Sequence, residues 1–140
     1  MFPLTGAMKV GYNSWMGSLE WVFAAYGEVP EQWNMAEDGT LQYGSVHPGT
    51  KQALAKLREW MEKGYIHPDT ALWDEGKSAE IWTKGNAGIL PGAQWVPDWP
   101  APDLTKNVPH AEYKAYPILR DLTERSEPNG EAVRARTAIF

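Results

Sequence analysis

Prolines gather in one stretch of the chain, and this stretch limits the possible fold more than any other feature. Five of the 11 prolines lie within residues 91–109. A proline has no backbone N–H and a fixed φ, so it disrupts helix interiors and central strands. The sequence therefore predicts a long loop over residues 91–110. Because this loop also holds Trp95 and Trp99, and long loops inside compact domains are commonly functional, we expect it to be ordered and to have a functional role.

Upstream of this loop, apolar residues recur at the spacing of a helix. The first such stripe consists of Trp15, Leu19, Val22, Phe23 and Tyr26. It predicts a helix over residues 15–26. Asn13 or Ser14 is expected to cap its start, and Gly27 to end it in a left-handed turn.

Two further helices carry clearer start and stop signals. The stronger one is predicted between Pro48 and Gly64. Its expected buried face consists of Ala53, Leu54, Leu57, Trp60 and Met61. A shorter helix is predicted over residues 75–84, with Asp74 as its cap. Its inward-facing side chains are expected to be Ile81 and Trp82.

Short strands are predicted between these helices. A hairpin is expected around the turn Asp38-Gly39, and a buried strand at residues 87–90. Residues 113–119 could return as a strand, and residues 120–140 are expected to form a charged hairpin or tail. The sum is a single α/β domain over residues 1–140, helix-rich with a few short strands.

Composition excludes several classes of function. The chain has 140 residues, 13 basic and 18 acidic side chains, and a net charge of −5. Without a basic stripe, binding to nucleic acid is not expected. The absence of cysteine excludes disulfides, zinc ribbons and thiol nucleophiles. No histidine pair has metal-ligand spacing and no glycine-rich phosphate loop is present, so no metal or cofactor is predicted.

Tryptophan is the informative residue type, with eight copies against six tyrosines and three phenylalanines. Trp60 and Trp82 fall on predicted buried faces and are expected to be structural. By contrast, Trp15, Trp95 and Trp99 fall at a helix start or in the loop, where rings are accessible. Flat aromatic faces pack against the C–H face of a pyranose ring, so these residues indicate a sugar site. The alternative is that all eight simply fill space.

Other functions stay open at this level. Asp98 and Asp103 share the predicted loop, and a pair of carboxyl groups can hydrolyse a glycosidic bond. A carbohydrate-active enzyme or a carbohydrate-binding module would therefore use the same loop. A structural or protein-interaction domain would need no ligand at all.

The order of several segments resembles the extracellular solute-binding proteins of carbohydrate-uptake ABC transporters, especially the lipoprotein branch of Gram-positive bacteria. In chain order these segments are Phe23-Ala24-Ala25-Tyr26-Gly27, Trp33, Asp38-Gly39-Thr40-Leu41, the helix at residues 51–63, Gly64-Tyr65-Ile66-His67-Pro68-Asp69, Lys84-Gly85-Asn86-Ala87-Gly88-Ile89 and Trp95. The resemblance covers roughly residues 2–119 and implies a non-catalytic receptor for a sugar or oligosaccharide, with a peptide ligand as a variant.

The more distant maltose-binding branch of this family implies roles for individual residues. There, an aromatic cluster precedes the first helix and reaches the sugar, and residues 11–15 stand in that place here. A Gly-Pro-Trp segment supplies a stacking ring in that branch, and Trp95 occupies the corresponding place. By the same resemblance Tyr12, Asn13, Trp15, Asp98 and Trp99 are further ligand-binding candidates.

Family members have two lobes, so the resemblance implies that this chain is a central fragment, mostly one lobe, of a larger receptor. The second lobe, a signal peptide and a lipidated cysteine would then lie outside these 140 residues. The implied partners are the missing lobe and the membrane subunits of an ABC permease. The implied location of the full-length parent is extracytoplasmic, anchored as a lipoprotein.

Overall fold

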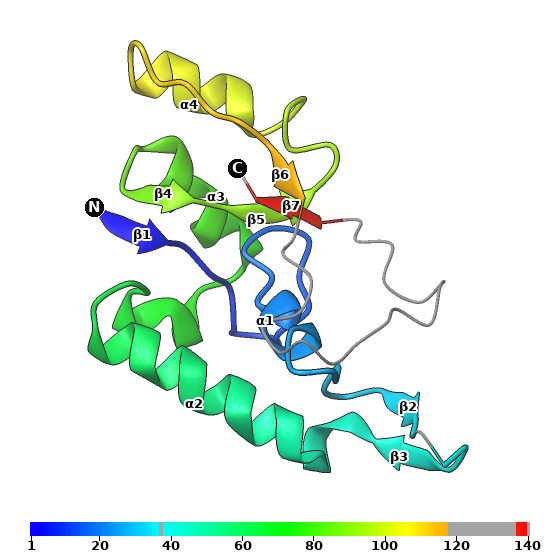
Figure 1. Cartoon of the computed structure of the whole chain (residues 1–140). Coiled ribbons are helices and arrows are strands. Elements are labelled where there is room, and N and C mark those ends of the chain that lie inside the picture. The colour runs from blue at the N-terminus through cyan, green and yellow to red at the C-terminus, as the bar shows by residue number, and fades with distance from the viewer. Residues whose placement is uncertain (37, 118–136, 140) are drawn as a thin grey trace.

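The computed structural model describes residues 1–36, 38–117 and the backbone of 137–139, and shows a mixed α/β fold (Figure 1). Its helices are α1 (Glu20–Ala24), α2 (Pro48–Glu62), α3 (Glu75–Thr83) and α4 (Ala101–Asn107), with 3-10 turns η1 (Gly44–Val46) and η2 (Pro68–Leu72). Its strands are β1 (Phe2–Leu4), β2 (Trp33–Met35), β3 (Leu41–Tyr43), β4 (Ala87–Ile89), β5 (Pro91–Ala93), β6 (Tyr116–Pro117) and β7 (Thr137–Ile139). The predicted α/β class is confirmed at this level.

The strands form three small sheets. β1 and β4 pair in parallel, with Phe2 opposite Ala87. β2 and β3 form the predicted hairpin around Gly39, with Trp33 opposite Tyr43. β7 lies between β5 and β6 and is antiparallel to both. In Figure 1, α2 and α4 lie on opposite sides of the molecule, with β1, β4 and α3 between them.

Helix α2 follows the sequence prediction closely. Pro48 opens it, and the Nδ1 of His47 accepts a hydrogen bond of 3.1 Å from the Gly49 N–H at the N-terminus. Gly64 follows its end with a φ of 70°, which favours glycine. Ala53 and Leu57 are buried as expected, whereas Leu54 is 42% exposed. The prediction for Leu54 is wrong because the helix buries a narrower face than its apolar residues suggest.

The first predicted helix is much shorter than expected. α1 begins at Glu20, and Gly17 has a φ of 73°, so an α-helix cannot run through residues 15–18. Leu19 precedes the helix without a side-chain cap, so the predicted cap at Asn13 or Ser14 is wrong. The predicted end is confirmed, since Gly27 has a φ of 84°.

The predicted proline-rich loop contains regular structure at both ends. Pro91 opens β5, and Pro102 is the second residue of α4. The prediction of one continuous loop over residues 91–110 is therefore wrong. Proline is tolerated at the start of a strand and in the first turn of a helix, where its missing N–H leaves little unpaired.

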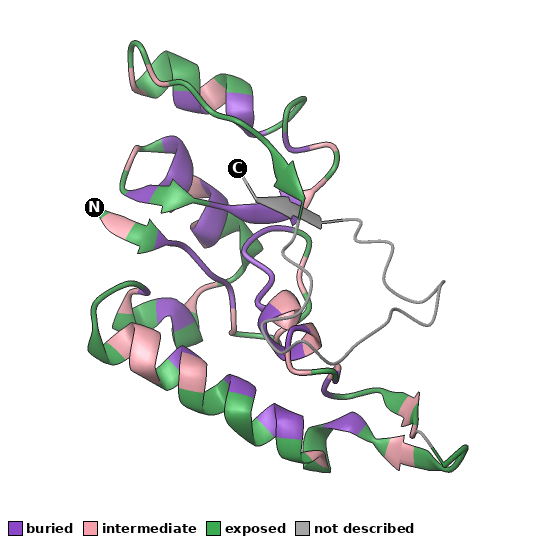
Figure 2. Cartoon of the chain, in the orientation of Figure 1, coloured by how far each residue is buried: buried purple, intermediate pink, exposed green. Residues whose placement is uncertain are grey.

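Two apolar clusters form the core. One contains Leu19, Val22 and Phe23 from the α1 region together with Ala53 and Leu57 of α2, Leu4 and Ile66. The other consists of Met16, Ala79, Trp82, Ala87, Leu90, Val96, Ala101 and Leu104. Trp82 is buried and Trp60 packs against the first cluster, which confirms their structural assignment. Buried positions lie on the inward sides of α2 and α3 (Figure 2).

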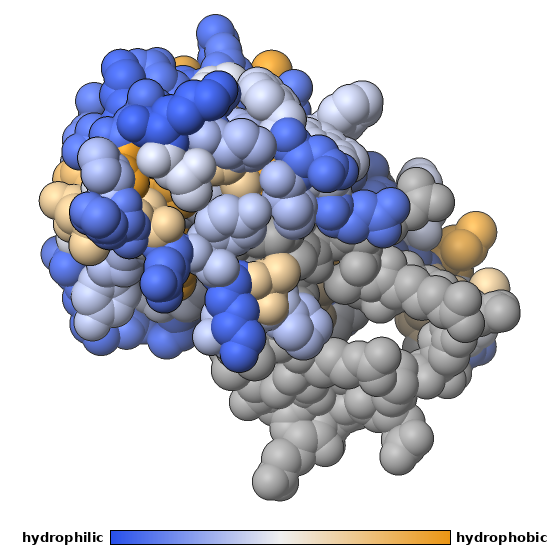
Figure 3. Space-filling model, turned by 90° about the horizontal axis from the view of Figure 1, so that it is seen from above, coloured by the Kyte–Doolittle hydropathy of each residue, from blue (hydrophilic) through white to orange (hydrophobic). Residues whose placement is uncertain are grey.

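The remaining predictions concern the C-terminal part. Within the predicted strand at 113–119, only β6 is a strand among the described residues. Most of the predicted hairpin or tail at 120–140 lies outside the described residues, although β7 lies within it. Seen from above, the described surface is mainly hydrophilic with small apolar patches (Figure 3). In the described part of the chain, no helix has the length and apolarity needed to cross a bilayer.

Candidate aromatic ligand site

Three tryptophans from two distant parts of the sequence surround one surface pocket of about 480 Å³. Its described lining residues are Trp15, Met16, Glu75, Gly76, Trp95 and Trp99. We call this set the tryptophan pocket. All three of the tryptophans predicted to be accessible are among these lining residues.

Trp15 is held by its own backbone between β5 and α3. Its carbonyl accepts a hydrogen bond of 3.3 Å from the Ala93 N–H. Its N–H donates to the Oε2 of Glu75 at 3.1 Å. The next residue, Met16, is buried and forms an isolated antiparallel bridge with Gly92. These contacts fix the backbone of Trp15 and leave the residue 71% exposed.

Trp95 and Trp99 stand on the turn that follows β5. The Trp95 carbonyl accepts hydrogen bonds from the N–H groups of Asp98 and Trp99, at 2.9 and 3.2 Å. This winding is helix-like, and a spacing of four residues then places both rings on the same side. The intervening Val96 is fully buried and anchors the turn in the core.

The three rings form a continuous aromatic surface. The ring centroids of Trp15 and Trp95 lie 6.2 Å apart at an interplanar angle of 64°. Trp95 and Trp99 are also 6.2 Å apart but nearly parallel, at 21°. Trp95 is partly buried between its neighbours, whereas Trp99 is 52% exposed. Trp95 is therefore the central ring of the pocket, in contact with both others.

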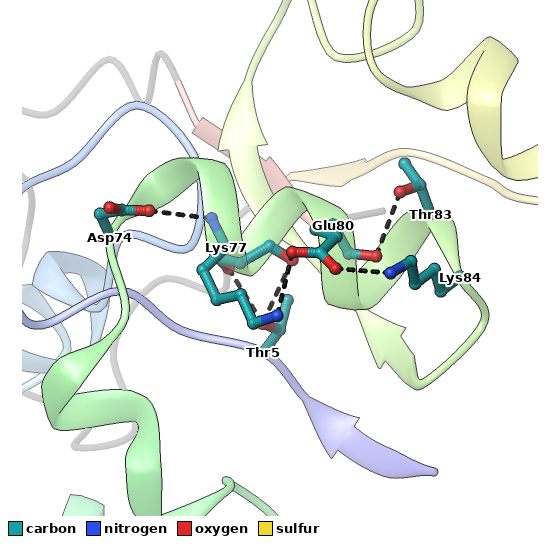
Figure 4. A network of polar contacts seen from close by, with 7 residues as sticks. Thr5, Asp74, Lys77, Glu80, Thr83 and Lys84 are labelled. Carbon is teal, nitrogen blue, oxygen red and sulfur yellow. Dashed lines mark hydrogen bonds and ion pairs between the residues drawn. The ribbon is translucent and has the colours of Figure 1, made fainter.

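The start of α3 provides the polar side of the pocket. Asp74 caps this helix, its Oδ1 accepting from the Lys77 N–H at 2.9 Å, as the sequence predicted. Glu75 and Gly76 follow in the first turn and line the pocket. The hydroxyl groups of Thr5 and Ser78 are hydrogen-bonded at 2.9 Å and fasten α3 to the chain after β1 (Figure 4).

Basic side chains of α3 are engaged away from the pocket. The Nζ of Lys77 lies 2.9 Å from one oxygen of Glu80, and the Nζ of Lys84 lies 2.5 Å from the other (Figure 4). Hydrogen bonds from Lys84 and Lys77 lower the pKa of Glu80 to about 2. Glu80 therefore pairs with both lysines of α3, and the three side chains together keep one positive charge.

Three other residues predicted for the site do not line the tryptophan pocket. Tyr12 packs on Phe23, with 4.5 Å between ring centroids. Burial raises the pKa of Tyr12, and the negative charge of Glu31 raises it further. Asn13 and Asp98 are exposed on the surface. The structure thus brings together three of the six predicted residues.

No signal in the sequence indicated the three remaining lining residues. Met16 and Gly76 carry no chemical signal of binding. Glu75 is interpreted from sequence as a first-turn acid favoured by the helix dipole, a position that many helices share. Its hydrogen bond to Trp15 joins residues 60 positions apart, which no local pattern can reveal.

A second, larger pocket of about 770 Å³ lies between β4 and the segment that follows α4. Trp82, Gly88, Leu104, Val108 and Tyr116 are among its lining residues, and none of the predicted site residues contributes to it. Among the residues that the structure describes, no group of three acidic or histidine side chains could hold a metal ion.

Comparisons with known proteins add no relative to this picture. No family model, no curated protein and no solved structure matches the chain.

Proposed function

We propose that this chain binds a sugar or oligosaccharide without chemical conversion, as part of a receptor for uptake by an ABC transporter. The observation that carries the proposal is the tryptophan pocket, where Trp15, Trp95 and Trp99 present adjoining rings around one hollow. Binding sites of this kind are concave and mostly apolar, with a few polar groups that fix the ligand.

The chemistry of the lining favours a pyranose. An indole face matches the apolar C–H face of a sugar ring in size and flatness, and the two angles between the rings allow one or two sugar units to be contacted at once. Carboxylate oxygens of Glu75 accept hydrogen bonds, as sugar hydroxyls require. This combination gives both the apolar contact and the polar contact in one place.

Binding is a better proposal than hydrolysis because of the number of acids in the lining. Glycosidases of the common type need two carboxyl groups on either side of the scissile bond. Among the described lining residues, Glu75 is the one carboxyl group. Asp98 is exposed outside the lining, and Asp103 lies in the first turn of α4, where it accepts a hydrogen bond of 3.1 Å from Lys106.

The receptor assignment itself rests on the ordered resemblance of the segments and on the mixed α/β fold. On this proposal the chain is most of one lobe of a periplasmic-binding-protein-like fold, and the ligand is enclosed when a second lobe closes over the pocket. The parent protein would be an extracytoplasmic lipoprotein that delivers its ligand to permease subunits. Since one lobe supplies only part of the contacts, we expect the 140-residue chain alone to bind sugars weakly.

Saturation-transfer NMR tests sugar binding, because it detects weak complexes through magnetisation passed from tryptophan protons to the sugar C–H groups. We expect transfer from the unaltered chain to members of a panel of mono- and oligosaccharides. Trp99→Ala should reduce it strongly, since this half-exposed ring can be removed without opening the core. Trp33→Ala, at an exposed ring of the β2–β3 hairpin, is the matched control. Absence of transfer to every saccharide would overturn the proposal, and so would equal effects of the two substitutions.

Two further observations separate a receptor from an enzyme. Neighbouring DNA that encodes a signal peptide with a lipobox and permease subunits would support the receptor assignment. Release of reducing sugar from oligosaccharides, abolished by Asp98→Asn or Asp103→Asn, would instead favour a hydrolase and contradict non-catalytic binding.

A further inference from the structure

We propose that the tryptophan pocket selects saccharides that carry a protonated amino group, and disfavours acidic sugars. This inference rests on the proposed sugar-binding function and adds the charge class of the ligand. It follows from the charges that surround the pocket and from the electronic character of its walls.

The pocket lining is negatively charged. Glu75 is the single ionisable side chain among its described lining residues. One of its oxygens accepts a hydrogen bond of 3.1 Å from the backbone N–H of Trp15. A carboxylate has about four acceptor positions on its two oxygens, so this bond leaves room for a ligand donor. An ammonium group is the donor that gains most from such a partner, because both groups are charged.

Among the described residues, the other charged groups near α3 lie outside the lining and are exposed to solvent, which screens them. Asp74 is adjacent in sequence and lies 3.8 Å from Lys9 in a pair whose side chains are both more than half exposed, so these two charges roughly offset each other. Lys77 and Lys84 share the carboxylate of Glu80, at 2.9 and 2.5 Å, which leaves one net positive charge on side chains outside the described lining. The N-terminus of α3 contributes about half a positive charge, which is less than the full negative charge of the Glu75 carboxylate.

The aromatic walls act in the same direction. The face of an indole ring is electron-rich and attracts a cation within about 6 Å of the ring centroid. The ring centroids of Trp15 and Trp99 each lie 6.2 Å from that of Trp95, so a cation bound on the face of Trp95 lies near more than one indole ring. An anionic sugar meets repulsion from the same faces and from Glu75.

Three sugars with the same ring skeleton test the inference: glucosamine, N-acetylglucosamine and glucuronate. Titrations by saturation-transfer NMR at about pH 6 and low salt keep amino groups protonated and ordinary carboxyl groups ionised. We expect glucosamine to bind about three- to tenfold more tightly than N-acetylglucosamine, and glucuronate to bind most weakly. Raising the salt concentration should reduce the differences in affinity among the three sugars.

Glu75→Gln removes the charge and keeps an oxygen that can accept the Trp15 N–H. The ratio of the two affinities, glucosamine over N-acetylglucosamine, should then fall about threefold or more. Glu62→Gln changes the net charge equally, but Glu62 lies on α2 beside Arg58, so the ratio should stay as it was. A preference for glucuronate, or an unchanged ratio in Glu75→Gln, would overturn the inference.

The two proposals fail in different ways. Absence of binding by all three sugars would overturn the sugar-binding function. Binding of all three with equal affinity would leave that function standing and overturn the charge selection alone. Choline, a cation without a sugar ring, completes the set: if it bound as tightly as glucosamine, the pocket would recognise the charge and not the saccharide.

Discussion

Two regions of this molecule expose tryptophan, and they differ in how the ring is supported. In the tryptophan pocket, the rings come from two distant places in the sequence and surround a hollow next to a carboxylate. In the β2–β3 hairpin, Trp33 is 67% exposed and lies 5.6 Å from Tyr43, its partner on the adjacent strand. Met35 and Leu41 are exposed on the same face of this hairpin.

The polar groups of the hairpin are directed to its other face. Asn34 donates to the Oε2 of Glu28 at 2.7 Å, and Gln42 donates to the other oxygen at 3.3 Å. The aromatic pair is therefore separated from the hydrogen-bonding groups, whereas the tryptophan pocket has both on one surface. Exposure of an aromatic ring does not by itself make a binding site. A site also requires concavity and polar groups that point the same way.

The largest expected difference between the regions concerns two glycines with positive φ. Gly17→Ala would place a Cβ 2.3 Å from the Oγ of Ser78, at a φ of 73°, next to the pocket. Overpacking and the left-handed conformation together should destabilise the protein by about 2–5 kcal/mol. Gly39→Ala, in the hairpin turn at a φ of 80°, meets no atom within 4 Å and should cost about 1–2 kcal/mol.

Urea unfolding followed by tryptophan fluorescence measures both glycine variants. Gly17→Ala should also weaken sugar binding, because Met16 and Trp15 must shift. Equal loss of stability in the two variants would show that the contact of residue 17 with α3 is not tight.

Removal of the central ring should have the next largest effect. Trp95→Ala is expected to weaken sugar binding about tenfold or more, since Trp95 adjoins both other rings of the pocket. Trp33→Ala should change the affinity less than about twofold. Saturation-transfer titration gives both values. Circular dichroism must show that Trp95→Ala still folds, and Trp99→Ala serves as the check if it does not.

The support of the hairpin should matter to stability and not to binding. Asn34→Ala removes the hydrogen bonds to Glu28 and to the Val29 carbonyl, at 2.7 and 3.1 Å. The buried Glu28 carboxylate then loses one hydrogen-bond donor, which should lower the free energy of unfolding by about 1–2 kcal/mol. Thermal unfolding measures this cost, and sugar affinity should stay unchanged. A parallel loss of affinity would mean that the two regions are coupled.

The smallest expected effect is a loss of stability at acidic pH. The pKa of Glu80 on α3 and that of Glu59 on α2 are both lowered to about 2, by hydrogen bonds from lysines within one turn. A carboxyl group with a lowered pKa stabilises the fold above its unfolded value of 4.5, and this contribution is lost as the pH falls from about 4.5 to 2. Both glutamates and their lysine partners are exposed to solvent, so the loss of stability should be small.

Urea midpoints at neutral pH and at about pH 3 report this acid effect. Glu80→Gln should make the urea midpoint depend less on pH, because it removes the contribution from α3. Glu59→Gln should do the same by removing the contribution from α2. A steeper dependence after either substitution would contradict the assigned sign.

Local signals in the sequence determined several elements correctly. The hairpin follows from Asp38-Gly39, α2 from Pro48 and Gly64, and α3 from its Asp74 cap. Each of these signals acts within a few residues of the structure that it specifies, so neighbouring sequence is sufficient. Three accessible tryptophans could also be recognised, because Trp95 and Trp99 fall outside the helical stripes and Trp15 falls at the start of a predicted helix.

Only the tertiary structure decided how these pieces meet. α1 begins late because Gly17 is pressed against Ser78 of α3, and Trp15 faces Trp95 because Met16 pairs with Gly92 of β5. The bond from Trp15 to Glu75 spans 60 residues. Such contacts depend on which distant segments pack together, and neither propensity nor periodicity encodes that. The sequence alone indicated that the rings of Trp15, Trp95 and Trp99 stay accessible, and packing between distant segments made a pocket from them.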